Sequence, residues 1–97
     1  MYNRNYYNKM YSTRIKDNDN NVVLEYPVPG FEKKDLNLSV KENYLLLKGE
    51  SGELKFEDAF RLGNKIDQEN INAEVVNGVL VVTLKKTSPD TKEIAIN

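Results

Sequence analysis

The sequence feature that most restricts the fold is an alternation of apolar and polar residues, with a period of two, in short segments. Turn signals that contain Gly30, Gly52 and Gly78 separate several of these segments. A period of two is typical of β-strands, whose side chains point alternately to opposite faces of a sheet. The expected strands cover residues 12–16, 22–28, 36–40, 44–50, 54–62, 71–76 and 79–84.

Seven short strands with no amphipathic helix between them predict an all-β fold. We expect an immunoglobulin-like antiparallel β-sandwich, with a barrel as the alternative. The connection 63–70, with a polar loop at 65–70, is long enough to cross between two sheets, which favours the Greek-key sandwich. The expected organisation is a short flexible N-terminal arm at 1–11, the sandwich at 12–86 and a C-terminal tail at 87–97.

The composition excludes most enzyme chemistry. The 97 residues include neither cysteine nor histidine, which removes Ser-His-Asp and Cys-His centres, disulfides and the usual zinc sites. Glu57 and Asp58 would point to opposite faces of a strand and could not easily share a substrate. No glycine-rich phosphate loop occurs, so no nucleotide is expected. We therefore expect no enzyme, no catalytic residue, no metal ligand and no cofactor.

The expected location follows from what the sequence does not contain. No apolar run approaches the roughly 18–20 residues of a bilayer span, and Met1 is not followed by an apolar signal segment. The absence of cysteine fits a reducing compartment. We expect the cytoplasm, or the host cytoplasm if a virus encodes the chain.

The first eleven residues mix tyrosine, asparagine and methionine and have neither a helical nor a strand period. Residues 1–16 carry four basic and no acidic side chains, whereas the other 81 carry 10 basic and 15 acidic ones. The rings and cations of this arm could contact nucleic acid, but the acidic body would repel phosphate. A nucleic-acid module is therefore the less favoured interpretation.

The C-terminal tail ends in an isolated apolar pair. Ile94 and Ile96 follow the polar hinge 87–91 and are spaced as neighbours on one face of an extended chain. Two alternatives are open, because the pair could fold back as a last edge strand or dock into another subunit.

Five motifs occur in one order along the chain. They are Pro29-Gly30-Phe31 before Lys34-Asp35-Leu36, Leu45-x-Leu47-x-Gly49-Glu50, Phe56-x-x-x-Phe60-x-Leu62, Ala73-x-x-x-Asn77-Gly78-Val79-Leu80, and Ile94-x-Ile96. In this order they resemble the α-crystallin domain of small heat-shock proteins, from about residue 22 to the C terminus. A co-chaperone or protein-interaction module of the same sandwich fold is the alternative, although that class generally lacks the terminal I-x-I.

The resemblance implies an ATP-independent holdase chaperone that binds partly unfolded client proteins and forms dimers and higher homo-oligomers. Its anchor would be Ile94 and Ile96, docked in an edge groove of a neighbouring subunit. The residues that would line this groove are Leu36, Leu38, Val40, Ile71 and Ala73. Client contacts would come from arm residues, namely Met1, Tyr2, Tyr6, Tyr7, Met10 and Tyr11.

Departures from the family pattern concern dimerisation. Asp58 stands where the family usually has arginine, and the turn 51–53 leaves no room for the long exchanged loop of many members. Antiparallel pairing of the edge 54–62 is one substitute, and a different contact is the other. The residues of this dimer edge would be Leu54, Phe56, Asp58 and Phe60. The short arm also predicts smaller oligomers or weaker holding than in longer members.

Overall fold

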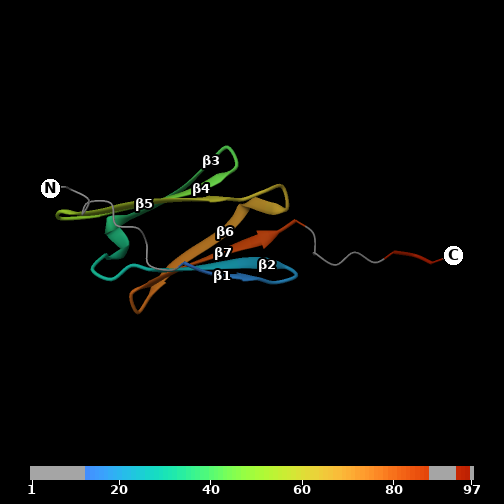
Figure 1. Cartoon of the computed structure of the whole chain (residues 1–97), viewed down its shortest axis with the longest axis horizontal. Helices are drawn as coiled ribbons and strands as arrows, with labels where there is room; N and C mark the ends of the chain where they lie inside the picture. The colour runs from blue at the N-terminus through green and yellow to red at the C-terminus, as the bar shows by residue number, and fades with distance from the viewer. Residues whose placement is uncertain (1–12, 88–93, 97) are drawn as a thin grey trace.

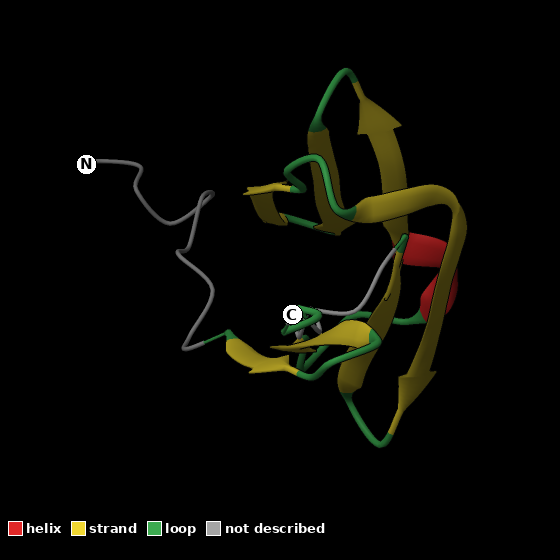
Figure 2. Ribbon diagram, turned by 90° about the vertical axis from the view of Figure 1, so that its right-hand side faces the viewer, coloured by secondary structure: helices red, strands yellow, loops and turns green. Residues whose placement is uncertain are grey.

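The chain folds into two antiparallel sheets packed face to face (Figure 1, Figure 2). A computed structural model describes residues 13–87 and 94–96. The strands are β1 (Arg14–Asp17), β2 (Asn21–Pro27), β3 (Leu36–Lys41), β4 (Tyr44–Ser51), β5 (Leu54–Arg61), β6 (Ile66–Val76) and β7 (Val79–Lys86). Among the described residues, one 3-10 turn, η2 (Lys33–Asp35), lies in the connection between β2 and β3. The all-β antiparallel sandwich is therefore confirmed.

The two sheets have strand orders β1-β2-β7-β6 and β3-β4-β5. The chain changes sheet between β2 and β3 and again between β5 and β6. Consequently β3 and β5 are the edges of one sheet, and β1 and β6 are the edges of the other. These four edges are where the sandwich presents unpaired backbone groups.

The prediction of a polar loop over residues 65–70 was wrong from Ile66 onward. Ile66 pairs with Lys86 and is buried, so β6 already begins there. A register shift follows before Ile71, and the shifted segment is closed by Asp67, which accepts hydrogen bonds from the Glu69 amide (3.0 Å) and the Asn70 side chain (2.7 Å). The Asn70 bond, followed by the Glu69 bond, lowers the pKa of the Asp67 carboxyl. The polar residues 67–70 therefore belong to a bulged edge strand and not to a loop.

The core confirms the predicted alternation of apolar and polar residues along the strands. Alternate residues of the central strands are buried, and the residues between them are exposed or half-buried. The buried apolar residues are Val22, Leu24, Tyr26, Val28, Leu45, Leu47, Phe56, Leu62, Ile66, Leu80, Val82 and Leu84. One parity of each strand therefore faces the opposite sheet, and the other faces away from it.

Gly49 is required by a close approach of an aromatic ring. It pairs across the sheet with Phe56, and a Cβ atom at position 49 would overlap the Phe56 ring. The ring in turn meets Phe31 edge to face, with ring centroids 5.0 Å apart and an interplanar angle of 86°. Gly49, the glycine of the Leu45-x-Leu47-x-Gly49-Glu50 motif, thus has a packing role that any sandwich of this kind could use.

Candidate functional site

An apolar groove opens between the edge strands of the two sheets. It has a volume of about 420 Å³ and lies between β3 and β6. The residues that line it are Lys33, Leu36, Leu38, Leu47, Ala73, Glu74, Val75 and Leu80. Six of these eight side chains are apolar, and the two charged ones have opposite signs. Such a surface suits a short apolar segment flanked by charge.

Three of the five groove residues expected from the sequence line this groove together. Leu36 and Leu38 come from β3 and Ala73 comes from β6. Ile71 packs against the core on the same strand but does not line the groove, and Val40 is 38% exposed and lies outside it. The groove is therefore centred closer to the start of β3 and the end of β6 than expected.

The sequence reasoning missed the other groove residues. Val75 continues the alternation that begins at Ile71 and could have been found from it. Leu47 and Leu80 belong to neighbouring strands, and they reach the groove only because β4 pairs with β3 and β7 pairs with β6. No local signal in a single strand could have placed them there.

The anchor residues lie apart from the groove in this structure. Ile94 is 82% exposed and Ile96 is 94% exposed, and Figure 1 shows this end of the chain beyond the sandwich. Two fully exposed β-branched apolar side chains are unfavourable in water unless a partner covers them. The expected client residues, Met1, Tyr2, Tyr6, Tyr7, Met10 and Tyr11, lie outside the described residues.

The expected dimer edge is the outer edge of β5, which is the last strand of its sheet among the described residues. Leu54 is 44% exposed, Asp58 and Phe60 are half-buried, and Phe56 is buried in the core. The even-numbered side chains of β5 therefore face the other sheet. The Phe56 side chain packs against Phe31 and Gly49 and is therefore not available to an interface.

Asp58 has a partner within its own chain. The Tyr26 hydroxyl, on the opposite sheet, donates a hydrogen bond to the Asp58 carboxylate. Burial raises the pKa of Tyr26 well above its usual value, and the charge of Asp58 and the hydrogen bond to it act in the same direction. Because Tyr26 is 1% exposed, its hydroxyl has little access to water. An acceptor at position 58 thus satisfies a buried donor.

The basic residues of β1 are paired with acids of the body. Arg14 and Lys16 lie 3.9 Å and 3.4 Å from carboxylate oxygens of Glu25 on β2. Asp17 accepts a hydrogen bond of 2.7 Å from the buried ammonium group of Lys86. Two of the four basic residues of the N-terminal segment thus share one carboxylate, which offsets part of their charge and weakens the nucleic-acid interpretation further.

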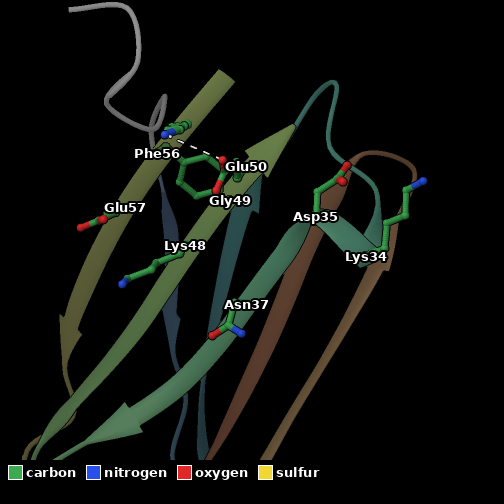
Figure 3. Close-up of a pocket in the computed structure, with 9 residues that line it drawn as sticks. Lys34, Asp35, Asn37, Lys48, Gly49, Glu50, Phe56 and Glu57 are labelled. Carbon is green, nitrogen blue, oxygen red and sulfur yellow. Dashed lines mark ion pairs between the residues drawn. The ribbon is translucent and has the colours of Figure 1, made fainter. Parts of the chain in front are cut away.

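A second hollow, on the three-stranded sheet, is polar and carries both signs of charge (Figure 3). It has a volume of about 660 Å³, and its lining includes Lys34, Asp35, Lys48, Glu50 and Glu57. No group of three metal-ligating side chains occurs among the described residues. The hollow brings together no arrangement of nucleophile and base.

The geometry defines an α-crystallin-type sandwich with an apolar groove at its edge, and the comparisons with known proteins agree. The family model described as Hsp20/alpha crystallin family matches residues 14–97. The chain belongs to this family. Small heat-shock proteins are ATP-independent chaperones of the stress response, and this chain is accordingly a member of a chaperone family and not an enzyme.

Individual relatives support the assignment. The chain is 29% identical over 96 residues to the probable 15 kDa heat shock protein of Leptospira interrogans, covering 84% of this chain and 74% of the relative. It is 33% identical over 97 residues to small heat shock protein C1 of Rickettsia bellii, covering 84% of this chain and 57% of that one. It also spans only 41% of a chloroplastic small heat shock protein of Solanum lycopersicum.

Solved structures share the fold. Heat shock protein 16.0 from Schizosaccharomyces pombe matches with a TM-score of 0.68 and 25% identity, over 89% of this chain and 74% of that chain. A small heat-shock protein from Xylella fastidiosa matches with a TM-score of 0.71 and 22% identity, over 92% and 99% of the two chains. Within the described part of the chain, no helix has the length and apolar character needed to cross a bilayer.

Proposed function

We propose that the chain is an ATP-independent holdase that binds partly unfolded proteins and assembles by docking its I-x-I tail into the edge groove of a neighbouring copy. The observation that carries the proposal is the pairing of an apolar groove with two exposed isoleucines on one chain. Holding requires apolar surface that is covered at rest and available on demand. A groove plugged by an exchangeable tail meets that requirement.

The path of the chain favours a neighbour over self-docking. The tail leaves after Lys86, which pairs with Ile66, whereas the groove lies near Val75 and Leu80 at the other end of β6. Leu80 and Lys86 lie six residue steps apart along β7, about 20 Å at 3.3 Å per residue. The eight residues from Lys86 to Ile94 span at most about 29 Å. A return to the same groove would use most of that reach and would also have to reverse direction.

The docking energy is of the size that an exchangeable contact needs. Full burial of Ile94 and Ile96 contributes about 3–6 kcal/mol. Ordering the tail and restricting the two copies opposes this by several kcal/mol. A single docked tail is therefore weak, and several tails in one assembly hold it together through effective concentration.

Client binding falls to the vacated groove and to the tyrosine- and methionine-rich arm. Methionine and tyrosine present adaptable apolar surface, which suits binding to many unfolded segments. The partners that we propose are the chain itself and unfolded clients, and we place the protein in the cytoplasm. Release and return of the tail would expose and rebury the apolar groove, and this binding cycle needs no nucleotide.

The first experiment tests whether the isoleucine side chains, and not the rest of the tail, hold the assembly together. The variant Ile94→Gly with Ile96→Gly should reduce the sedimenting particle to dimers or smaller with unchanged circular dichroism. The control is Ala95→Gly, which adds backbone freedom at one position of the same segment and keeps both isoleucines.

A second pair of variants tests the groove. Ala73 and Asn72 are adjacent, both exposed, and only Ala73 lines the groove. Ala73→Glu should disassemble the particle, whereas Asn72→Glu should not. The docking proposal is rejected if the double glycine variant retains its native particle size, and the holdase proposal is rejected if the native protein fails to suppress the aggregation of a heat-unfolded client.

A further inference from the structure

The outer face of the four-stranded sheet carries a continuous apolar patch. The side chains of β2 and β7 that alternate with the buried ones point away from the other sheet, and their partners on β6 do the same. At one end of this face, Val79 pairs with Pro27 on one side and with Val76 on the other. The next outward residue of β7 is Val81, and Val23 lies diagonally across from it on β2. These five residues are the outer apolar patch.

The outer apolar patch has no covering element among the described residues. The two sheets pack through their inner faces, and the patch lies on the opposite side of its sheet. Val76 is 45% exposed, and the other four residues are half-buried by their neighbours in the sheet. A contiguous apolar face of this kind is a typical contact surface for another segment.

Carboxylates flank the outer apolar patch on both sides of Val81. Glu25 and Glu74 lie directly opposite Val81 on the two neighbouring strands. Glu25 is already paired with Arg14 and Lys16. Within the described part of the chain, the ion pairs do not include Glu74, which is exposed. An apolar segment that carries a cation would therefore complement this face.

The segment before the described sandwich has this composition. Residues 1–12, which include the N-terminal arm, contain four tyrosines, two methionines, two basic residues and no acidic one. Tyrosine and methionine bury large apolar surfaces, and the tyrosine hydroxyl can remain in water at the rim of a contact. The arm thus supplies both the apolar groups and the positive charge that the face lacks.

The arm also joins the sheet beside the patch. Arg14 pairs with Glu25, and β1 runs antiparallel to β2, so the chain before Arg14 comes from the level of Pro27. From β1 to β6 there are three strand spacings of about 4.8 Å, about 14 Å in all. Twelve extended residues reach about 40 Å. The arm is therefore long enough to cross the whole sheet, and its attachment gives it a high effective concentration there.

A crossing that starts at the end of β1 brings particular residues to the patch. An extended segment advances about 3.3 Å per residue, so Lys9 would lie about 10 Å from β1, at the distance of β7. Tyr7 and Tyr11 are two steps on either side of Lys9 and share its face of an extended segment. They would then fall near Val76 on β6 and near Pro27 on β2.

We propose that the N-terminal arm crosses the outer face of its own four-stranded sheet, with Tyr7 and Tyr11 on the outer apolar patch and the Lys9 ammonium beside the Glu74 carboxylate. The inference deepens the proposed function, and it rests on that function for the role of the arm in client binding. Clients compete with the sheet for the same tyrosines. The docked arm is then the resting state, and the released arm is the binding state.

Two engineered cysteines test the path of the arm, because the chain contains none of its own. Tyr7→Cys with Val76→Cys should form a disulfide within one chain under mild oxidation. The matched control is Tyr7→Cys with Asn72→Cys. Asn72 is exposed on the same face of β6, four residue steps or about 13 Å from Val76. This separation exceeds the span of a disulfide, so the yield at position 72 should be at least about fivefold lower.

Mass spectrometry without reduction separates the outcomes of this experiment. Monomers that have lost both thiols, formed preferentially with Val76→Cys, support the proposal. Equal yields from the two variants, or no disulfide in either, mean that the arm has no fixed place on the face and overturn the proposal. Disulfide-linked dimers as the main product would assign the face to the arm of another copy and overturn the path within one chain.

Charge reversal tests the contact between Lys9 and Glu74. Glu74→Lys should raise the rate at which chymotrypsin cleaves the arm about threefold, because an attraction becomes a repulsion. The matched control is Glu53→Lys, which makes the same change of charge at an exposed position of the turn between β4 and β5. It should leave the rate unchanged.

The reciprocal variant completes this test. Adding Lys9→Glu to Glu74→Lys should return the cleavage rate to within about 1.5-fold of the parent, when each rate is divided by that of a free peptide with the same arm sequence. All of these samples carry Ile94→Gly and Ile96→Gly, because Glu74 also lines the groove. Equal effects of Glu74→Lys and Glu53→Lys, or an unrestored double variant, overturn the placement of Lys9.

Failure of the docking and failure of the client-binding proposal are distinguishable. In the chain with its native tail, the disulfide of Tyr7→Cys with Val76→Cys should lower the suppression of client aggregation at least about twofold, and reduction should restore it. A disulfide that forms without this loss supports the docking and rejects the arm as a client-binding segment. Full protection of clients by a chain that forms no disulfide rejects the docking alone.

Discussion

The hydrogen bond between Tyr26 and Asp58 joins the two sheets, and its removal should have a measurable effect on stability. Tyr26 is 1% exposed and donates to a carboxylate. Hydrogen bonds to charged acceptors contribute about 1.5–3 kcal/mol. Tyr26→Phe keeps the ring and removes only the hydroxyl, so we expect the free energy of unfolding to fall by about 1.5–3 kcal/mol.

A double-mutant cycle isolates the contact from the packing. Asp58→Ala should leave the Tyr26 hydroxyl buried without an acceptor, at a cost of about 1–3 kcal/mol. Adding Asp58→Ala to Tyr26→Phe should then cost much less than Asp58→Ala alone, with a coupling energy of about 1.5 kcal/mol or more. Urea unfolding followed by circular dichroism, at one fixed protomer concentration, measures all four proteins. Additive effects, with a coupling below about 0.5 kcal/mol, would refute a stabilising bond between the sheets.

Three further predictions concern the core and its charges. Gly49→Ala should lower the free energy of unfolding by about 1–3 kcal/mol through overlap with Phe56, and Gly49→Ala with Phe56→Leu should cost less than the sum of the single variants, as judged by urea midpoints. The raised pKa of Tyr26 means that its contribution is complete below its unfolded pKa of about 10 and is lost as pH rises toward the folded value, so the stability advantage over Tyr26→Phe should shrink above pH of about 10. Asp17→Asn should cost about 1–3 kcal/mol because the buried Lys86 ammonium loses its carboxylate, and adding Lys86→Met should recover part of that loss in thermal unfolding.

Most of the fold could be predicted because its dominant signal is local. The alternation in β2, β4 and β7 is strict, and each alternate residue of the apolar set is buried where expected. The start of β6 could not be predicted because the residues after Ile66 are polar and the strand bulges there. β1 was placed near residues 12–16 and lies at Arg14–Asp17, a shift expected for a strand in which every residue is exposed.

The groove was only partly predictable because it depends on which strands end at the same edge. Leu36, Leu38 and Ala73 were found from their alternation and from the resemblance to a known family, whereas Leu47 and Leu80 required the sheet order. Asp58 could be recognised as the odd polar member of an inward-facing set. Its partner Tyr26 lies 32 positions away on the other sheet, and a contact of that kind carries no local signal.

The place where the tail leaves the sandwich constrains the architecture of any assembly. Lys86 ends β7 opposite Ile66, at the start of β6, and the groove lies toward the other end of β6. In the proposed docking, each copy would be a donor at one pole and an acceptor at the other, a head-to-tail link that on its own closes into a ring or runs on as a filament. Under that proposal, the length of the polar segment that follows Lys86 is the natural variable for redesigning particle size.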